Sequence, residues 1–288
     1  LAKRGHDVHV RNKCTAPVRH EGVDWVPIGS ADGDSNLGLP EDTDLYIANR
    51  GDKLLSAMAK ARRTAFWIHN PARYLLKWRY LSKLWRTRPI IVFIGAYHAT
   101  TYPWWAPDGG RVVIPYGIPD VIRNATAAAD APPPRAIFTS NPLRSLDWLL
   151  KVWVERVRPR VPGAELHLFT GAATYGTVGN AKAREMLAVL DDARKAAAHG
   201  VVVRAPVPKA QLAEELRASR VMLYRGDVNE TFCLAVGEAQ ALGVPAVVQR
   251  LGSVVERIID GETGVIAADD AAFAEAAISL LTDDALWH

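Results

Sequence analysis

Two glutamates in the second half of the chain have the spacing of a ligand-binding pair. Glu230 and Glu238 lie eight positions apart, the first just before a predicted helix and the second within it. Carboxylate oxygens accept short hydrogen bonds from vicinal hydroxyls, and a helix start offers free amides and a positive dipole end to a diphosphate. The pattern therefore fits a ligand in which a diphosphate joins a sugar to a ribose. Two glutamates alone are more often a cap residue and a solvent-facing residue.

The residues that follow make the pattern more specific. The chain continues as Gly-Val-Pro-Ala-Val-Val from Gly243, then Gly252, Glu256 and Asp-Gly-Glu-Thr-Gly from Asp260. This combination resembles the family-4 (group 1) retaining glycosyltransferases of the GT-B fold. The resemblance covers residues 136–281 and, more loosely, the first half. It implies a hexosyl-transferring enzyme that moves a sugar from a nucleotide-diphosphate-sugar donor to a glycan, lipid or small-molecule hydroxyl, with retained configuration.

The resemblance also implies roles for individual residues. Glu230 would act as a catalytic residue that holds donor-sugar hydroxyls near the reactive carbon, and Glu238 would bind the ribose hydroxyls. Backbone amides between them would line the sugar and phosphate side of the donor; these belong to Thr231, Phe232, Cys233 and Leu234.

A cation before the first long helix of the second half completes the implied donor site. Arg144 falls where the family has a phosphate-binding lysine, and its guanidinium offers a planar fork where lysine offers a point charge. Thr139 stands where the family has an arginine, so that half of the phosphate clamp is replaced by a hydroxyl. Gly171 matches the family glycine that faces the nucleotide. A surface arginine and an ordinary tight turn are the competing interpretations of Arg144 and Gly171.

Two histidines in the first half are candidates for further catalytic groups. His69 follows a predicted strand, at the position where many family members place a histidine that faces the donor or the acceptor. We include it with Glu230 as a catalytic candidate, although a lone histidine at a strand end is more often structural. His98 is a poorer candidate.

Strand-like and helical segments alternate along the chain, which predicts an α/β fold with parallel sheets. We expect two Rossmann-like, doubly wound domains facing across a cleft, with ligands at the carboxyl ends of strands. The predicted acceptor-side domain covers residues 1–132 and the donor-binding domain 133–288, with an Ala/Pro-rich linker at 125–134. Leu1 to Gly5 has the pattern of a helix end, so we expect the N-terminal domain to be a fragment that lacks its first strand.

The ranges of the expected elements follow from the apolar runs. In the first half we expect strands at 8–11, 45–48, 64–68 and 90–94, and helices near 52–61 and 72–86. In the second half we expect strands at 136–139, 166–170, 201–204, 221–224, 245–249 and 264–267. Helices are expected there at 146–157, with Ser145 as the cap, and at about 181–198, 208–219, 253–260 and 270–281. A further helix is expected after the loop 225–229 and ends at Gly243.

Composition indicates an ordinary globular protein. The 288 residues are 49% hydrophobic and 23% charged, with a net charge of +4. No apolar run is long enough to span a bilayer, and no signal-peptide pattern opens the chain. The two cysteines, Cys14 and Cys233, show no pairing pattern, which favours a reducing compartment. We therefore expect the cytoplasm, with the inner face of the membrane as an alternative location.

One segment of the first half has the composition of a membrane-binding helix. Residues 73–88 combine Arg and Lys with Tyr and Trp, and no acidic residue occurs between Thr64 and Pro107. A basic, aromatic helix of this kind can lie on an anionic membrane surface. The alternative is a solvated helix whose aromatic residues face the domain core. We find no nucleic-acid-binding module and expect no nucleic-acid partner.

The sequence lacks the motifs of two other chemistries. The predicted donor domain contains no Asp-x-Asp, so we expect no metal ion, and a nucleotide-sugar co-substrate without a further cofactor. A hydride-transferring enzyme would need Gly-x-Gly-x-x-Gly between a strand and a helix, and we find none. A non-catalytic nucleotide-sugar-binding or membrane-binding module of the same fold remains the alternative, mildly favoured by Thr139.

Overall fold

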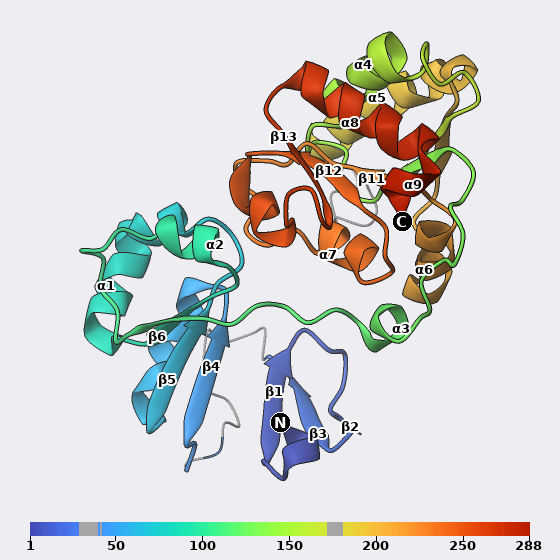
Figure 1. Cartoon of the computed structure of the whole chain (residues 1–288). Helices are drawn as coiled ribbons and strands as arrows, with labels where there is room; N and C mark the ends of the chain where they lie inside the picture. Colours follow the sequence, from blue (N-terminus) through green and yellow to red (C-terminus); the bar gives the residue numbers. More distant parts are fainter. Residues whose placement is uncertain (29–39, 41, 172–180) are drawn as a thin grey trace. The chain divides into compact units, whose positions relative to one another are not determined.

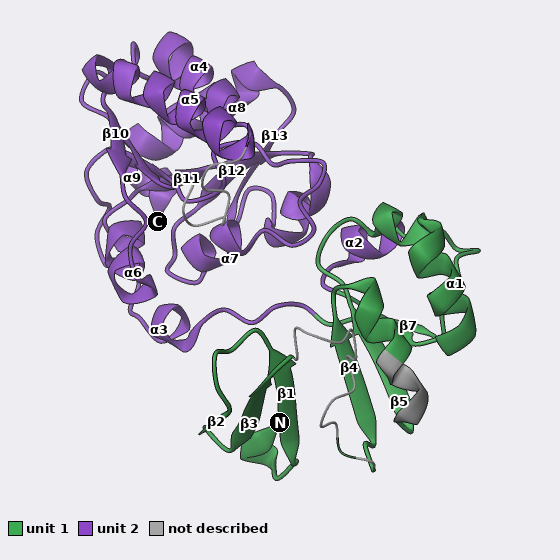
Figure 2. Ribbon diagram, turned by 180° about the vertical axis from the view of Figure 1, so that it is seen from behind, with its two compact units in different colours: residues 1–93, 101–114 green, residues 94–100, 115–288 purple. Residues whose placement is uncertain are grey.

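The computed structural model describes residues 1–28, 40, 42–171 and 181–288, with side chains except at 57–60. The chain forms two compact units (Figure 2). Unit 1 contains Leu1–Phe93 and Thr101–Ile114, and unit 2 contains Ile94–Thr100 and Pro115–His288. The predicted domain boundary at residue 132 remains a prediction; Ile122, which precedes it, packs in the core of unit 2.

Unit 1 contains two sheets (Figure 1). In the first, β1 (Val8–Asn12) pairs in parallel with β3 (Val23–Pro27), which pairs antiparallel with β2 (Val18–His20). A 3-10 turn, η1 (Ala2–Arg4), precedes β1 and ends at Gly5 in the left-handed conformation, as its sequence predicts. The strand at 8–11 is confirmed, whereas β2 and β3 were not predicted.

The second sheet of unit 1 is parallel and runs in chain order. It contains β4 (Leu45–Asn49), β5 (Arg63–Trp67), β6 (Ile90–Phe93) and β7 (Arg111–Val113). The connections are η2 (Asp52–Lys60), η3 (Ala72–Leu76) and α1 (Trp78–Thr87). The helix expected at 72–86 is therefore interrupted at Lys77, which is extended. One face of this sheet borders a hollow of about 780 Å³ lined mainly by apolar side chains, among them Ile47, Trp67 and Val112.

Unit 2 is built on a six-stranded parallel sheet with the order β10-β9-β8-β11-β12-β13. Its central strands are short apolar runs that are mostly buried, as expected for a parallel sheet covered on both faces, and its edge strands are partly exposed. They are β8 (Arg135–Phe138), β9 (Glu165–Phe169), β10 (Val201–Arg204), β11 (Val221–Leu223), β12 (Ala246–Gln249) and β13 (Gly264–Ala267). The six strands expected in this half are confirmed to within a residue at each end.

Helices cover both faces of the unit 2 sheet. Figure 1 shows α4 (Leu146–Val152), α5 (Ala181–Lys195) and α8 (Asp270–Thr282) on one face, with α6 (Lys209–Arg217) and α7 (Leu234–Gln240) on the other. Right-handed crossovers in this strand order require that α4 and α5 lie on the face opposite α6 and α7, because the connections after β8 and β11 run in opposite directions. The carboxyl ends of β8 and β11 therefore form a topological switch point, where such folds bind ligands.

Shorter elements complete unit 2. A π-helical turn, η4 (Trp153–Val157), continues α4, and η6 (Ala196–His199) continues α5. The remaining ones are α2 (Ala96–Thr100), α3 (Asp120–Arg123), η7 (Gly252–Arg257) and α9 (Asp284–Trp287). The expected capping of α4 by the Ser145 side chain is wrong. Ser145 has a φ of 60°, and its hydroxyl donates to the carbonyl oxygen of Gly226 at 3.2 Å instead.

Candidate active site

The loop after β11 carries Glu230 and is held by backbone contacts. The Glu230 amide donates to the Asp227 carbonyl at 2.8 Å, and the Glu230 carbonyl accepts from the Ser253 amide at 3.0 Å. Gly252 has a φ of +65°, and a Cβ there would lie 2.1 Å from the Asp227 carbonyl oxygen. Only glycine fits this close approach, so the η7 turn fixes the position of the Glu230 backbone.

The Glu230 side chain is buried and both of its oxygens are engaged. Oε2 accepts hydrogen bonds from the Tyr224 hydroxyl at 3.0 Å and from the Arg144 guanidinium, and Oε1 accepts from the Cys233 amide at 3.3 Å. The residue is 7% exposed. A buried carboxylate needs such partners to remain charged. The structure thus brings together two predicted site residues, Glu230 and Arg144, at the switch point between β8 and β11.

The partners of Glu230 respond to its charge and to burial. Burial by itself would lower the pKa of Arg144, but the adjacent Glu230 carboxylate raises it, so the guanidinium stays charged. Burial raises the pKa of the Tyr224 hydroxyl, which stays protonated and can donate. Sequence reasoning missed Tyr224. The sequence feature that could have predicted Tyr224 is its hydroxyl at the end of the predicted strand 221–224, six positions before Glu230.

Glu238 lies in α7 and is even less exposed, at 3%. Both of its oxygens accept hydrogen bonds from Nζ of Lys209, the first residue of α6, at 2.6 Å each. The Lys209 side chain is 48% exposed, so the ammonium group lies at the edge of the buried carboxylate. Lys209 was also missed, because a lysine at the start of a polar helix usually indicates only a solvated residue.

The residues between the glutamates form the turn into α7. Thr231, Phe232 and Cys233 are buried, and α7 begins at Leu234. The Phe232 ring contacts the Tyr116 ring edge-on at 5.1 Å and the Arg257 guanidinium at 4.4 Å. Burial raises the pKa of the Cys233 thiol, which therefore remains uncharged. The binding of a diphosphate by the amides of this turn stays a prediction.

Thr139 and Gly171 lie at the same edge of the sheet as Glu230. Thr139 directly follows β8 and Gly171 follows β9 within two residues. The Thr170 hydroxyl donates to the Ser140 carbonyl at 2.7 Å and links the two strand ends. A Cβ at Gly171 would lie 3.3 Å from the Pro206 ring, so the glycine also permits close packing. Their roles in donor binding stay predictions.

The two histidines have different surroundings. His69 belongs to unit 1, where a ring nitrogen and the Asn49 side-chain oxygen lie 2.6 Å apart and its ring lies 5.4 Å from that of Trp67. Its catalytic role stays a prediction. His98 is fully buried and accepts a hydrogen bond from the Ile94 amide at 3.2 Å, which is a structural role.

The basic aromatic segment of unit 1 divides its rings between two sides of α1. Tyr80 is buried and meets Tyr74 edge-on at 5.2 Å, whereas Trp78 and Trp85 are 77% and 62% exposed. Residues seven apart lie on one helix face. We call the surface formed by Trp78, Arg79, Trp85 and Arg86 the basic aromatic face. Within residues 1–28, 40, 42–171 and 181–288, no helix is long and apolar enough to cross a membrane.

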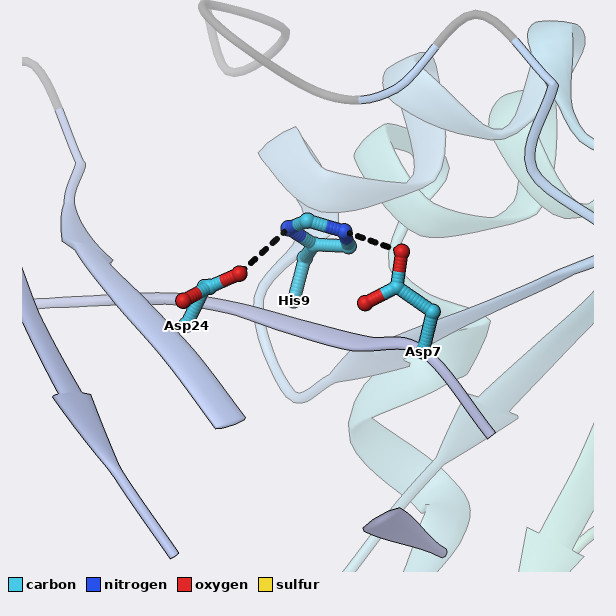
Figure 3. Close-up of side chains that lie close together, drawn as sticks. All are labelled: Asp7, His9 and Asp24. Atoms are coloured by element: carbon cyan, nitrogen blue, oxygen red, sulfur yellow. Dashed lines mark hydrogen bonds and ion pairs between the residues drawn. The ribbon is translucent and has the colours of Figure 1, made fainter. Parts of the chain in front are cut away.

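One cluster of possible metal ligands lies in unit 1. Among the residues that the structure describes, Asp7, His9 and Asp24 have ligand atoms within 4.8 Å of one another (Figure 3). The imidazole of His9 lies between the two carboxylates, at 3.1 Å from Asp7 and 3.8 Å from Asp24. Arg19 also binds both Asp24 oxygens at 3.0 Å. The positive charge of this guanidinium disfavours the binding of a metal cation at Asp24, and we assign no function to the cluster.

Comparison with known proteins identifies the family. A sequence model described as glycosyl transferases group 1 matches residues 134–283, more than half of the chain. The chain belongs to this family. D-inositol 3-phosphate glycosyltransferase of Corynebacterium diphtheriae is 38% identical over 89 residues, which cover 30% of this chain and 21% of that protein. The chain thus matches about a fifth of the length of such curated relatives.

Solved structures extend the likeness to the whole fold. Sucrose-phosphate synthase from Thermosynechococcus elongatus aligns with a TM-score of 0.71 at 15% identity, over 99% of this chain and 82% of that chain. A trehalose-6-phosphate structure from E. coli, bound with UDP-2-fluoro glucose, aligns with a TM-score of 0.70 at 12% identity, over 98% and 86%. The GT-B fold class predicted from the sequence is confirmed.

Proposed function

We propose that this group 1 glycosyltransferase moves a hexosyl group from a nucleotide-diphosphate-sugar donor to an acceptor hydroxyl, with retention of the anomeric configuration. One observation carries the proposal. At the switch point of the unit 2 sheet, the loops after β8 and β11 join Arg144 to Glu230, and Glu238 lies buried in the helix that follows. Parallel α/β sheets bind nucleotides at such switch points, which supports a donor site that contains this cation and these two carboxylates.

In this proposal each of the three charged groups binds a different part of the donor. Glu230, oriented by Tyr224, accepts hydrogen bonds from hydroxyls of the donor sugar. Glu238 accepts the ribose hydroxyls. Arg144 shares its guanidinium between Glu230 and the departing diphosphate, whose charge it stabilises, together with amides of the turn from Thr231 to Leu234. Thr139 and Gly171 border the nucleotide.

Catalysis then depends on positioning and on charge stabilisation of the leaving group. The two glutamates act as hydroxyl readers rather than as an acid and a nucleophile. We propose that the reaction requires neither a metal ion nor a further cofactor. His69 is proposed as a second catalytic residue, and the acceptor is a glycan, a lipid or a small molecule.

A nucleotide screen tests this proposal directly. Thermal shifts of the full chain would be recorded with nucleoside diphosphates and nucleotide-sugars, followed by donor-hydrolysis assays with and without acceptors. We expect stabilisation by at least one nucleotide, weaker binding by Glu238→Ala, and mainly lower turnover for Glu230→Ala. Binding without any turnover would instead support the non-catalytic module, and no shift with any nucleotide would overturn the proposal.

We also propose that the basic aromatic face of α1 rests on an anionic membrane, which would place the protein on the inner face of the cytoplasmic membrane. The exposure of Trp78 and Trp85 favours this, since an aromatic ring left in water stabilises no core. The guanidinium of Arg79 lies 5.3 Å from the centre of the Tyr80 ring, and both Arg79 and Arg86 are exposed. Exposed cations and tryptophans together suit the headgroup region of a bilayer.

Sedimentation with lipid vesicles tests the membrane proposal. The full chain should bind vesicles that contain phosphatidylglycerol and leave neutral phosphatidylcholine vesicles unbound. The double change Trp78→Ser and Trp85→Ser should weaken binding about tenfold or more. Trp104→Ser is the matched control, because this ring is 88% exposed but lies outside α1. Equal binding by the double variant and the control would refute the membrane role.

A further inference from the structure

We infer that Lys209 is a positioning residue of the nucleotide site, which orients the Glu238 carboxylate so that it selects ribonucleotides over deoxyribonucleotides. This inference rests on the proposed function, because it assigns Glu238 to the ribose hydroxyls. The observation behind it is the symmetric contact of Lys209 Nζ with both carboxylate oxygens, at 2.6 Å each.

The burial of the two partners is unequal. Glu238 is 3% exposed, whereas the Lys209 side chain is 48% exposed. A carboxylate so far from water needs hydrogen-bond donors from the protein. Within the described ranges, Lys209 provides the ion pair to Glu238. The lysine therefore fixes the position of the acid, whereas about half of the lysine side chain remains in water.

Counting acceptor sites shows that Lys209 leaves room for a ligand. A charged carboxylate has two lone pairs on each oxygen. The ammonium uses one on each oxygen, since its two contacts have the same length. One lone pair per oxygen remains, and these two match the two vicinal hydroxyls of a ribose.

The position of Lys209 along the chain supports a role beyond local helix stability. It is the first residue of α6, after the N-cap Pro208. The positive end of the helix dipole disfavours a cation at that point. A residue that opposes its local electrostatics is expected where a tertiary contact needs it. That contact is Glu238, 29 positions away in α7.

The test compares ribonucleotides with deoxyribonucleotides by calorimetry on the full chain. The probes are UDP, GDP and ADP and their 2′-deoxy counterparts, and the pair that contains the tightest ligand is used. Wild type should prefer the ribonucleotide by about tenfold or more, the value of a hydrogen bond to a charged group. Lys209→Met should reduce that preference to about threefold or less, and Lys209→Arg should keep it.

Two further variants keep the test decisive. The double variant Lys209→Met, Glu238→Gln should have the same preference for the ribonucleotide as Glu238→Gln alone. The double variant also replaces Lys209→Met if that single variant does not fold. Arg217→Met is the matched control, because it removes a cation that pairs with Glu214 at the other end of α6. That control should bind like wild type.

The possible failures are distinguishable. If wild type binds none of the six nucleotides, the donor site itself is wrong, and the role of Lys209 is overturned with it. If wild type prefers the ribonucleotide and Lys209→Met keeps that preference, only the role of Lys209 is overturned. A further loss in the double variant beyond Glu238→Gln would mean that Lys209 touches the ligand directly, which also overturns it.

Discussion

Two groups of cations in this chain have opposite surroundings. In unit 2, Arg144 and Lys209 each contact a buried glutamate, and the Tyr224 hydroxyl completes the hydrogen bonding of Glu230. In unit 1, Arg79 and Arg86 lie exposed beside two exposed tryptophans. The paired cations hold acids in place inside the protein. The exposed ones have their charge available for something outside it.

This difference predicts that a fixed backbone is essential for stability and activity around the paired cations of unit 2, and not around the exposed cations of unit 1. The largest effect should come from Gly252→Ala, whose new Cβ would lie 2.1 Å from the Asp227 carbonyl oxygen beside the Glu230 loop. We expect a loss of about 3 kcal/mol or more in the free energy of unfolding and loss of donor hydrolysis. Denaturant unfolding and hydrolysis assays measure the two effects.

Gly261→Ala provides the matched control for that change. Its φ is +81°, similarly left-handed, but no atom lies within 4 Å of the added Cβ. It should cost about 1 kcal/mol from backbone strain alone and leave hydrolysis intact. Equal losses for the two variants would show that the Glu230 loop is not fixed by this close approach.

The second prediction removes one cation from each group. Arg144→Gln leaves the buried Glu230 carboxylate without its guanidinium, so we expect a loss of about 2 kcal/mol, less than for a fully buried pair because the Arg144 side chain is 34% exposed. Arg86→Gln should change the free energy of unfolding by less than about 0.5 kcal/mol. Urea unfolding of both variants measures the difference. Similar values would remove the distinction between the two groups.

The sequence predicts one of these groups better than the other. Glu230 and Glu238 were found because their spacing and the Gly-Val-Pro that follows are local features. Their partners were missed: Lys209 meets Glu238 from 29 positions away, and such a contact follows from the strand order of the sheet. On α1, periodicity predicts a basic aromatic helix, but only packing shows which rings turn outward.

The same distinction explains the fold predictions. The strands of unit 2 are buried apolar runs, and their ranges could be predicted closely. β2 is three exposed residues and carries no apolar pattern, so it was missed. The failed cap at Ser145 has a similar cause, because its left-handed φ of 60° comes from the tertiary contact of its hydroxyl with Gly226.

A third prediction concerns the hydroxyl that orients Glu230. Tyr224→Phe removes the 3.0 Å hydrogen bond to Oε2 but keeps the buried ring. We expect a loss of about 1 kcal/mol in stability and a fall of about tenfold in donor hydrolysis, with nucleotide affinity unchanged. Calorimetry and hydrolysis assays separate the two. Weaker nucleotide binding with normal turnover would contradict the assignment of Tyr224 to the sugar end of the donor.

The smallest effect is expected for the ion pair of Lys83, a partly buried cation of α1. Lys83 donates to the Asp52 carboxylate at 3.0 Å, and this hydrogen bond lowers the pKa of Asp52 below its ordinary value. Because the folded pKa is the lower one, the pair stabilises the fold above about pH 4, and that stability is lost as the pH falls through the folded pKa. Asp52→Asn should therefore cost up to about 1 kcal/mol at pH 7 and almost nothing near pH 2. Urea unfolding at both pH values measures this. An unchanged difference between variant and wild type would mean that Asp52 contributes through packing rather than through its charge.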